Sequence, residues 1–322
     1  MTKSHRGNAT WLSLHIHAHD VRQHFDLMQS CCMPLLATAR AAGLLESWFY
    51  IRYWEGSPHI RLRLLGPVDE LRPLVRPGLD RAVASFVAAH PLEQLLDQDR
   101  YYQGFASDLQ GRNPAILPWV DHGIIEERVY EPETVRYGGE TALPISEQLF
   151  SVSSELAVRI LSAVAPSPSR LLALTSDVML MTVIGFDVRP REFFEEYQAS
   201  WSALRGKVEN ATPDNRAYQL QRAALAQKLS TFPTRVASEV YQTWFLSVLR
   251  ARHKLVTLLS NLDSINRSTA LRAICGSHVH MTNNRLGIMV GTEIYLARLI
   301  SDALVDVEID AIVDATLSRF PL

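Results

Sequence analysis

The 322-residue chain has few cysteines, few lysines and no long apolar run, and each of these shortages excludes a class of protein. Its three cysteines, Cys31, Cys32 and Cys275, form neither a disulfide framework nor a C-x-x-C pair. The most apolar stretch, residues 178–186, is far shorter than the roughly 20 residues that a membrane-spanning helix requires. The first seven residues lack the apolar core of a signal peptide. We therefore expect a reduced, cytoplasmic protein without a membrane span.

The charge is nearly balanced, with 32 basic and 34 acidic residues and a formal charge of −2. Such a chain lacks the broad cationic field that nucleic-acid binding requires, so we expect no direct contact with nucleic acid. Only 4 of the 32 basic residues are lysines, a bias that a GC-rich genome explains without any function. Hydrophobic residues make up 47% of the chain and charged residues 20%, which is the composition of a folded globular protein.

Residues 1–140 predict a mixture of strands and helices, whereas residues 141–322 predict helices almost throughout. Residues 11–19 alternate apolar and polar side chains, which is typical of a half-buried strand. Residues 48–54 and 59–65 are candidate strands on either side of a Glu-Gly-Ser-Pro turn, and the second of them alternates apolar and polar side chains, so the segment predicts a β-hairpin. We therefore expect an α+β fold, in which the two parts are either separate domains or portions of one continuous domain.

Local signals add detail to the first part. Residues 20–42 predict a helix that ends at Gly43. Its apolar face is expected to hold Val21, Phe25, Met28, Cys32 and Leu36. Residues 68–90 predict a helix broken at Pro73 and Pro77, because proline lacks the amide hydrogen that a helix needs. We expect residues 91–140 to be irregular apart from a strand at 124–130.

In the second part, Ser146 is expected to cap a helix that carries Leu149, Leu156 and Ile160. Further helices are expected over about 170–184, 190–206, 214–230, 234–261, 265–275, 292–304 and 307–318.

The hairpin concentrates positive charge. In its second strand His59, Arg61 and Arg63 alternate with apolar residues and so share one face. By its parity against Phe49, Arg52 of the first strand is expected on that face too. Guanidinium forks bind carboxylate or phosphate through paired hydrogen bonds. The face therefore predicts an anion-binding site, with structural salt bridges to nearby acidic residues as the alternative.

Aromatic residues flank this cluster. Trp48, Tyr50 and Trp54 have the parity of Arg52 and are expected beside the arginines, while Phe49 and Ile51 are expected on the other face. Aromatic groups beside arginines suit an adaptable groove for a peptide. Packing against a neighbouring element explains them equally well.

Two further segments carry candidate groups. Glu133 and Arg136 precede Gly138 and Gly139, whose backbone freedom allows a sharp turn. The turn can present Arg136 for function or hold it in a plain salt bridge with Glu133.

Residues 277–287 form the second segment, with the polar side chains His278, His280, Asn283, Asn284 and Arg285. If the segment is helical, His280 and Asn284 share a face. Histidine is the usual proton carrier near neutral pH, so His280 is a candidate acid or base. A capping or core histidine is the alternative.

Three histidines of the first strand, His15, His17 and His19, share one face at a spacing that suits a metal. Apart from the adjacent Asp20, no carboxylate or cysteine cluster completes a ligand set, so a polar strand face is the favoured interpretation and we expect no metal. The adjacent Cys31 and Cys32 lie among apolar residues and are expected to pack in the core.

Three separated motifs occur together in the chain: Trp48-Phe-Tyr-Ile-Arg-Tyr with Pro58-His-Ile-Arg-Leu-Arg63, then Glu133-x-x-Arg136-Tyr-Gly-Gly, then His280-Met-x-x-Asn-Arg285. Their order resembles the C-terminal, glutamate-elimination domain of the lantibiotic (class I lanthipeptide) dehydratases, here as a stand-alone protein of the thiopeptide type. The resemblance runs from Trp11 to about Leu304. Each motif alone is a weak signal, and only their combination is specific.

The resemblance implies a function. A separate, larger partner transfers glutamate from glutamyl-tRNA to Ser or Thr hydroxyls of a precursor peptide that carries a leader. By this resemblance, the present chain is expected to eliminate the glutamate and leave dehydroalanine or dehydrobutyrine. No metal and no other cofactor is implied.

The family's elimination residues correspond to Arg61 and Arg63, Glu133 and Arg136, and His280. His280 is then the expected acid or base, and Arg136 and Glu133 are the other two expected catalytic residues. Arg61, Arg63 and Arg136 are expected to bind glutamate carboxylates, and Glu133 is expected to orient an arginine or the glutamyl amine. The further substrate-binding candidates near these motifs are Arg52, His59, Asn284 and Arg285.

Two other functions remain open. A related branch of the same fold performs the formal [4+2] cycloaddition that forms the pyridine ring of thiopeptides, and length does not separate the two branches. A non-catalytic scaffold that binds a leader peptide or a partner enzyme is the third possibility.

Overall fold

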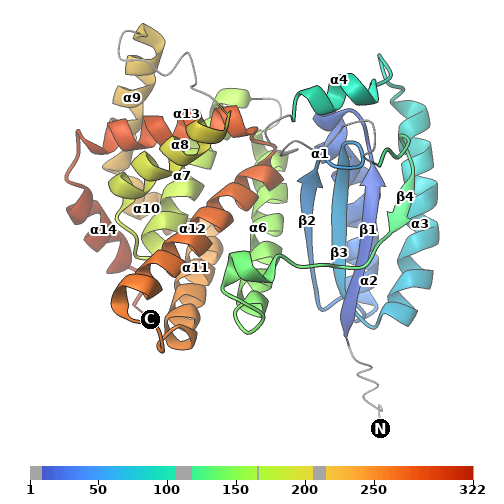
Figure 1. The fold of residues 1–322 in the computed structure, drawn as a ribbon, viewed down its shortest axis with the longest axis horizontal. Coiled ribbons are helices and arrows are strands. Elements are labelled where there is room, and N and C mark those ends of the chain that lie inside the picture. The colour runs from blue at the N-terminus through green and yellow to red at the C-terminus, as the bar shows by residue number, and fades with distance from the viewer. Residues whose placement is uncertain (1–8, 106–117, 165–166, 206–214, 322) are drawn as a thin grey trace. The chain divides into compact units, whose positions relative to one another are not determined.

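The computed structural model describes residues 9–105, 118–164, 167–205 and 215–321. Its helices and its single antiparallel sheet confirm the α+β class (Figure 1). Contacts divide the chain into two compact units, Met1–Pro132 and Glu133–Leu322, and each unit is described by itself.

The N-terminal unit is built on four strands: β1 (Thr10–His17), β2 (Ser47–Tyr53), β3 (His59–Gly66) and β4 (Ile125–Glu127). They lie in the order β2-β3-β1-β4, and all neighbours are antiparallel. Leu14 pairs with Leu62 and His15 with Arg61. Residues directly opposite each other point to the same face, so one face of the sheet is apolar and the other is rich in histidine and arginine. On the apolar face Leu12, Leu14, Ile16, Ile60, Leu62 and Leu64 are at most 1% exposed.

Helices pack against this sheet and against one another. The expected helix after β1 is continuous, but it changes type along its length. It comprises η1 (Val21–Gln23), α1 (His24–Leu27), the π-helical η2 (Met28–Cys32) and α2 (Met33–Ala41). Gly43 follows with a φ of +73°, a conformation that glycine adopts easily. Val21, which was expected on the apolar face, is 41% exposed. The 3-10 first turn and the π-helical turn change the helical periodicity, so Val21 does not lie on the buried side.

The predicted break at Pro73 and Pro77 is wrong. Helix α3 (Val68–Ala89) runs through both prolines. Its buried side chains are Leu71, Val75, Leu79, Val83 and Phe86. Burying each such side chain contributes about 1.5–3 kcal/mol, which together outweighs the roughly 3 kcal/mol cost of an interior proline.

The segment between α3 and the end of the unit was only partly predicted. The short helix α4 (Gln98–Gln103) was missed, although Asp97 caps it by accepting a hydrogen bond from the Arg100 amide. The expected strand at 124–130 is confined to β4. Part of the expected irregular region, residues 106–117, lies outside the described residues.

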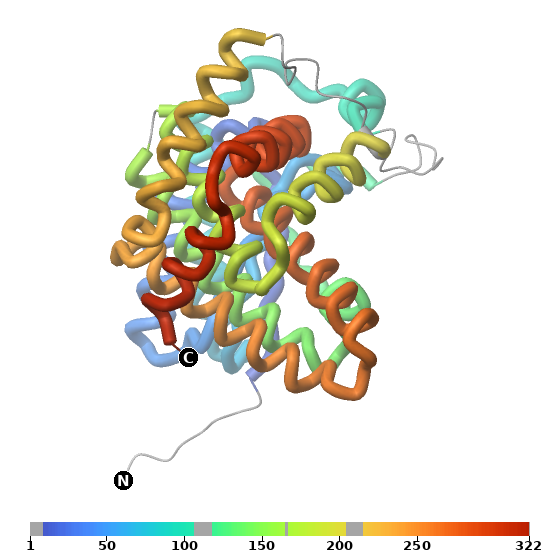
Figure 2. Tube along the Cα trace, turned by 90° about the vertical axis from the view of Figure 1, so that its left-hand side faces the viewer, coloured from blue at the N-terminus to red at the C-terminus, as the bar shows by residue number. Residues whose placement is uncertain are grey.

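The C-terminal unit is helical. It contains η4 (Thr134–Tyr137), α6 (Leu143–Val164), α7 (Pro168–Gly185), α8 (Pro190–Arg205), α9 (Arg216–Leu229), α10 (Phe232–Val236), α11 (Glu239–Leu258), α12 (Ser264–Leu286), α13 (Val290–Leu304) and α14 (Ile309–Leu317). Helix α7 is buried without interruption from Thr175 to Gly185, and both α11 and α12 pack on it. Helix α13 contacts α8 and α9, which lie on either side of it in Figure 2.

Several boundaries in this unit differ from the sequence expectation. The single helix expected over 234–261 is divided into α10 and α11. Helix α6 begins at Leu143, so Ser146 is an interior, fully buried residue rather than a cap. Helix α12 extends to Leu286 and includes the whole histidine-rich segment, because Asp263 caps its start and Gly287, at a φ of +77°, ends it. Among the described residues no single helix has the length and apolar composition of a membrane span, although α7 and α8, bent by 115° at their junction, reach them together.

The end of β3 gives a test of the N-terminal fold. A Cβ added at Gly66 would lie 2.1 Å from the backbone oxygen of Leu44 and 2.8 Å from Leu71 Cδ1. We expect Gly66→Ala to lower the free energy of unfolding by about 1–3 kcal/mol or more, since a backbone atom cannot yield. The control is Gly291→Ala, where no atom lies within 4 Å of the added carbon. Urea unfolding followed by circular dichroism measures both, and equal stability of the two variants would contradict this packing.

Candidate functional site

The polar face of the sheet carries the candidate groups of the N-terminal unit. In the β1–β3 pairing Ser13, His15 and His17 lie opposite Arg63, Arg61 and His59. A cavity of about 580 Å³ opens over this face. Among the side chains that line it are His15, His17, His59, Arg61, Arg63 and Glu126.

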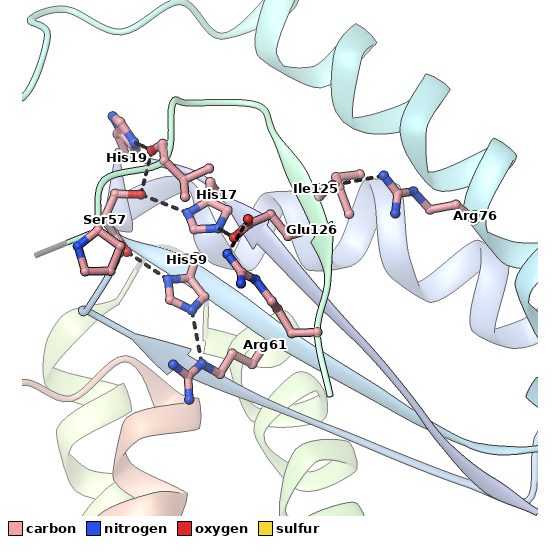
Figure 3. A network of polar contacts seen from close by, with 12 residues as sticks. His17, His19, Ser57, His59, Arg61, Arg76, Ile125 and Glu126 are labelled. Atoms are coloured by element: carbon pink, nitrogen blue, oxygen red, sulfur yellow. Dashed lines mark hydrogen bonds and ion pairs between the residues drawn. The ribbon is translucent and has the colours of Figure 1, made fainter. Parts of the chain in front are cut away.

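The side chain of Arg61 is oriented by a hydrogen bond to the buried His59. Its Nε donates to His59 Nε2 at 3.1 Å, and its guanidinium lies 3.3 Å from the centre of the Tyr53 ring. His59 Nδ1 lies 2.8 Å from the carbonyl oxygen of Ser57 and donates to it, as Figure 3 shows. Burial, with the nearby charge of Arg61, lowers the pKa of His59 to about 2. A neutral His59 therefore fixes the orientation of Arg61.

Arg63 lies on the same face but deeper, at 5% exposure. Its guanidinium carbon lies 4.6 Å from the Tyr130 ring centre and 5.5 Å from that of Phe49. Trp11 packs edge-on against both rings. An aromatic enclosure of this kind stabilises a cation and limits its movement.

His15 and His17 of β1 and His19, two residues after its end, each have separate contacts. His17 Nδ1 lies 2.8 Å from Ser57 Oγ, and its Nε2 lies 3.2 Å from Glu126 Oε2 (Figure 3). Burial and the charges of Arg61 and Arg63 lower the pKa of His15 to about 3. His19 Nε2 bonds the Val120 carbonyl at 2.9 Å. Within the described ranges no three His, Cys, Asp or Glu side chains form a group that could hold a metal ion.

The prediction that Arg52 joins this face is wrong. Arg52 pairs with Ile60, so it points to the opposite side of the sheet. There it donates from Nε to His24 Nδ1 at 3.2 Å and from a terminal nitrogen to the Val21 carbonyl at 2.6 Å. The register across the hairpin, which pairs Tyr53 with His59, determines this result.

The expected aromatic arrangement is reversed for the same reason. Phe49 and Tyr53 lie on the arginine face, opposite Arg63 and His59. Trp48 and Tyr50 are buried on the apolar face, at 1% and 3% exposure. Trp54 lies beyond the end of β2 and stacks on Phe105, with ring centres 4.9 Å apart.

In the C-terminal unit, the double glycine makes the expected turn. Gly138 and Gly139 have φ values of +87° and +94°. Arg136 bonds Glu133 at 3.0 Å, and its Nε donates to Ser277 Oγ, also at 3.0 Å. The turn therefore attaches Arg136 to helix α12.

His280 lies on α12 beside a buried carboxylate. Its Nδ1 lies 3.1 Å from Oε2 of Glu293 and 3.3 Å from Oε1. The Glu293 side chain is 0% exposed, whereas His280 keeps 19% exposure. Tyr197 donates to Glu293 Oε1 from α8, and the Trp201 ring centre lies 4.8 Å from that of His280.

The remaining polar residues of α12 separate into two groups. Asn284 is half-buried and lies one turn after His280. Arg285 is buried, and it donates to Ser154 Oγ at 3.1 Å and to the Met281 carbonyl at 2.9 Å. His278 is buried beside Ser146, and burial lowers its pKa to about 3. These contacts favour a structural role for Arg285.

Sequence reasoning missed Glu293 and Tyr197. Glu293 lies in a helix whose neighbouring side chains, such as Ile294 and Leu296, are buried. A single acidic residue on an apolar helix face is the signal that could have identified it, because a buried charge requires partners.

Comparison with known proteins assigns the chain to enzymes that act in the biosynthesis of ribosomally made peptides. The family model described as "Lantibiotic biosynthesis dehydratase C-term" matches residues 11–304, so the chain belongs to this family. This confirms the resemblance inferred from the three motifs. A search of curated protein sequences gives no significant match.

Solved structures share the fold at low sequence identity. A pyridine synthase, TbtD, from thiomuracin biosynthesis is 17% identical, with a TM-score of 0.68 over 92% of this chain and 98% of that chain. TsrL is 17% identical, with a TM-score of 0.63 over 96% of this chain and 99% of its own. The tRNA-dependent lantibiotic dehydratase MibB from Microbispora sp. 107891 is 20% identical, with a TM-score of 0.59 over 94% of this chain but 28% of its own.

The buried histidines predict a pH dependence of stability. The pKa values of His59 and His24 are lowered to about 2 and about 3, chiefly by burial, against about 6.5 in an unfolded chain. As the pH falls below about 6.5, these histidines become protonated in the unfolded chain but stay neutral in the folded protein. Each of them therefore lowers the free energy of unfolding by up to about 1.4 kcal/mol per pH unit. We expect urea unfolding to show this loss between about pH 6.5 and 4.

His59→Gln removes one of the histidines with a lowered pKa, so the free energy of unfolding of this variant should fall less steeply with decreasing pH than that of the unsubstituted protein. Above about pH 7.5 His59 is neutral in both the folded and the unfolded protein. The free energy of unfolding should therefore change with pH equally in the variant and in the unsubstituted protein. An unchanged slope in the acidic range would mean that His59 is not held neutral in the folded protein.

Proposed function

We propose that this chain eliminates glutamate from glutamylated Ser or Thr residues of a ribosomally made precursor peptide, leaving dehydroalanine or dehydrobutyrine. The observation that carries the proposal is that an arginine and a histidine of the family motifs, Arg61 and His280, are each oriented by a buried partner. Oriented cations and bases are what an elimination requires.

The chemistry needs a base and an anion-binding group. A base removes the α-proton of the glutamylated residue, and the electron pair forms an enolate. Collapse of the enolate forms the Cα–Cβ double bond, breaks the Cβ–O bond and releases glutamate as a carboxylate. Positive charge stabilises the enolate oxygen and the departing carboxylate.

Each motif residue takes a role in this scheme. His280 is the base, and Arg136, oriented by Glu133 and Ser277, binds a glutamate carboxylate and stabilises its negative charge. Arg61 and Arg63 bind glutamate carboxylates, since both line a cavity of about 580 Å³ on the polar sheet face. The neutral His59 and the aromatic rings around Arg63 keep the two guanidinium groups in place.

The proposed partners are a precursor peptide with its leader and a separate protein that transfers glutamate from glutamyl-tRNA. The chain covers 28% of the length of MibB, a tRNA-dependent dehydratase. The formal charge of −2 is consistent with tRNA binding by the partner.

Formation of a pyridine ring by [4+2] cycloaddition is a second candidate. Its support is the alignment with the pyridine synthase TbtD over 98% of that chain. That reaction starts from a peptide that already contains dehydroalanines, so the two candidates differ in substrate.

The first functional prediction uses this difference. Purified protein should release glutamate from a glutamylated precursor peptide without tRNA or ATP, because the leaving group is already installed, and should leave unmodified peptide unchanged. Mass spectrometry should show one mass loss per glutamyl ester. Intact esters after long incubation, together with conversion of a dehydrated, azole-containing peptide into a macrocycle, would establish the second candidate instead.

A second prediction separates substrate binding from proton transfer. Arg136→Lys keeps the charge but loses the planar fork, so it should weaken glutamate capture and raise KM. His280→Ala should still bind the glutamylated peptide but should lower kcat by the ~10²–10⁴-fold typical of a lost general base. With the glutamyl-transfer partner present, both variants should accumulate glutamylated precursor.

Arg189→Lys is the matched control, because Arg189 also bonds a glutamate three positions away, Glu192, at 2.6 Å. It should react like the unsubstituted protein, and circular dichroism should show that all three variants fold. A folded His280→Ala protein that reacts at the normal rate would make His280 structural.

A further inference from the structure

Glu293 occupies an environment that is costly for a carboxylate. It lies near the start of α13, its side chain is 0% exposed, and Ile294 and Leu296 beside it are buried in the core. A buried charge of this kind persists only where hydrogen-bond donors replace the lost water. Since packing alone does not explain a buried carboxylate at this position, we expect Glu293 to have a functional role.

Two donors from different helices meet this carboxylate. Tyr197 on α8 donates its hydroxyl to Oε1, and His280 on α12 approaches Oε2 with Nδ1 at 3.1 Å. Burial, together with the charge of Glu293, raises the pKa of Tyr197 well above its ordinary value, so this hydroxyl remains a donor. The positive charge of Arg136 also acts on Tyr197, and the Trp201 ring packs against the imidazole of His280.

The geometry determines which ring nitrogen of His280 carries the proton. An ionised carboxylate only accepts hydrogen bonds, so Nδ1 must donate to it. The neutral imidazole then carries no proton on Nε2, and this nitrogen keeps its lone pair. With its side chain 19% exposed, His280 is a base whose ring orientation and tautomer are both fixed.

We propose that Glu293 is a positioning residue that holds His280 as the Nδ1–H tautomer and thereby directs Nε2 to the proton it removes. Tyr197 supports it by holding Oε1, which leaves Oε2 to His280. The catalytic consequence rests on the proposed function of His280 as a base, whereas the tautomer itself does not.

The test is Glu293→Gln, which keeps the size of the side chain. With Tyr197 still donating to the amide oxygen, the amide nitrogen faces His280 Nδ1, which must then accept a hydrogen bond. The proton moves to Nε2 and blocks the base. We expect kcat for glutamate release to fall ~10²–10⁴-fold while KM changes much less, as in a triad that is locked in the wrong tautomer.

Nitrogen-15 NMR reads the tautomer directly, with the His280 signal assigned by comparison with His280→Ala. The unsubstituted protein should show Nδ1–H at a pH where His280 is neutral, and Glu293→Gln should show Nε2–H. An Nε2–H tautomer in the unsubstituted protein would overturn the inference, and this outcome does not depend on the folding of Glu293→Gln.

Asp302→Asn is the matched control. Asp302 lies on the same helix and also accepts from a tyrosine, Tyr218, at 2.6 Å, but it does not contact His280 in the described structure. It should leave both kcat and the His280 tautomer unchanged.

If Glu293→Gln also left both kcat and the His280 tautomer unchanged, the carboxylate of Glu293 would be merely structural. If the tautomer switched as expected but no glutamate were released even by the unsubstituted protein, the proposed function would fail while the positioning of His280 stood.

Discussion

Antiparallel pairing of β1 with β3 decides which side chains of the N-terminal unit enter the core and which line the cavity. Leu14 opposite Leu62 contributes to a face that is fully buried, and this burial holds His15 opposite Arg61 on the other face. A slip of one residue would exchange the two faces and place guanidinium groups in the core. The hydrophobic contacts of one face therefore fix the position of the charged groups on the other.

The same arrangement occurs in both units: a half-buried reactive group is oriented by a hydrogen bond to a fully buried partner. In the N-terminal unit the neutral His59 accepts from Arg61, and its own proton is committed to the Ser57 carbonyl. In the C-terminal unit Glu293 accepts from His280. In each case the buried partner occupies one nitrogen of the reactive group and orients the remaining nitrogens toward a substrate. This arrangement reduces the entropic cost of ordering the side chain during the reaction.

Much of this was predictable from the sequence, because strand and helix periodicity follow directly from burial of one face. The hairpin, its alternating second strand and the confirmed α+β class belong to this category. Arg52 was misplaced because parity along one strand gives no information on how two strands align, which depends on the turn between them. Glu293 was missed because its pairing with His280 joins two helices, and no short-range pattern encodes such a contact. The three family motifs identified His280 without revealing what orients it.

The most direct test of His280 as the base follows the α-hydrogen of the substrate. A glutamylated precursor peptide with deuterium at the α-carbon of the modified serine is incubated with the unsubstituted protein and with His280→Ala, and glutamate release and deuterium content are measured together. We expect the unsubstituted protein to release glutamate with complete loss of that deuterium, whereas the folded His280→Ala protein should leave both the glutamyl ester and the deuterium in the peptide. Equal release and equal deuterium loss by the two proteins would contradict this role of His280.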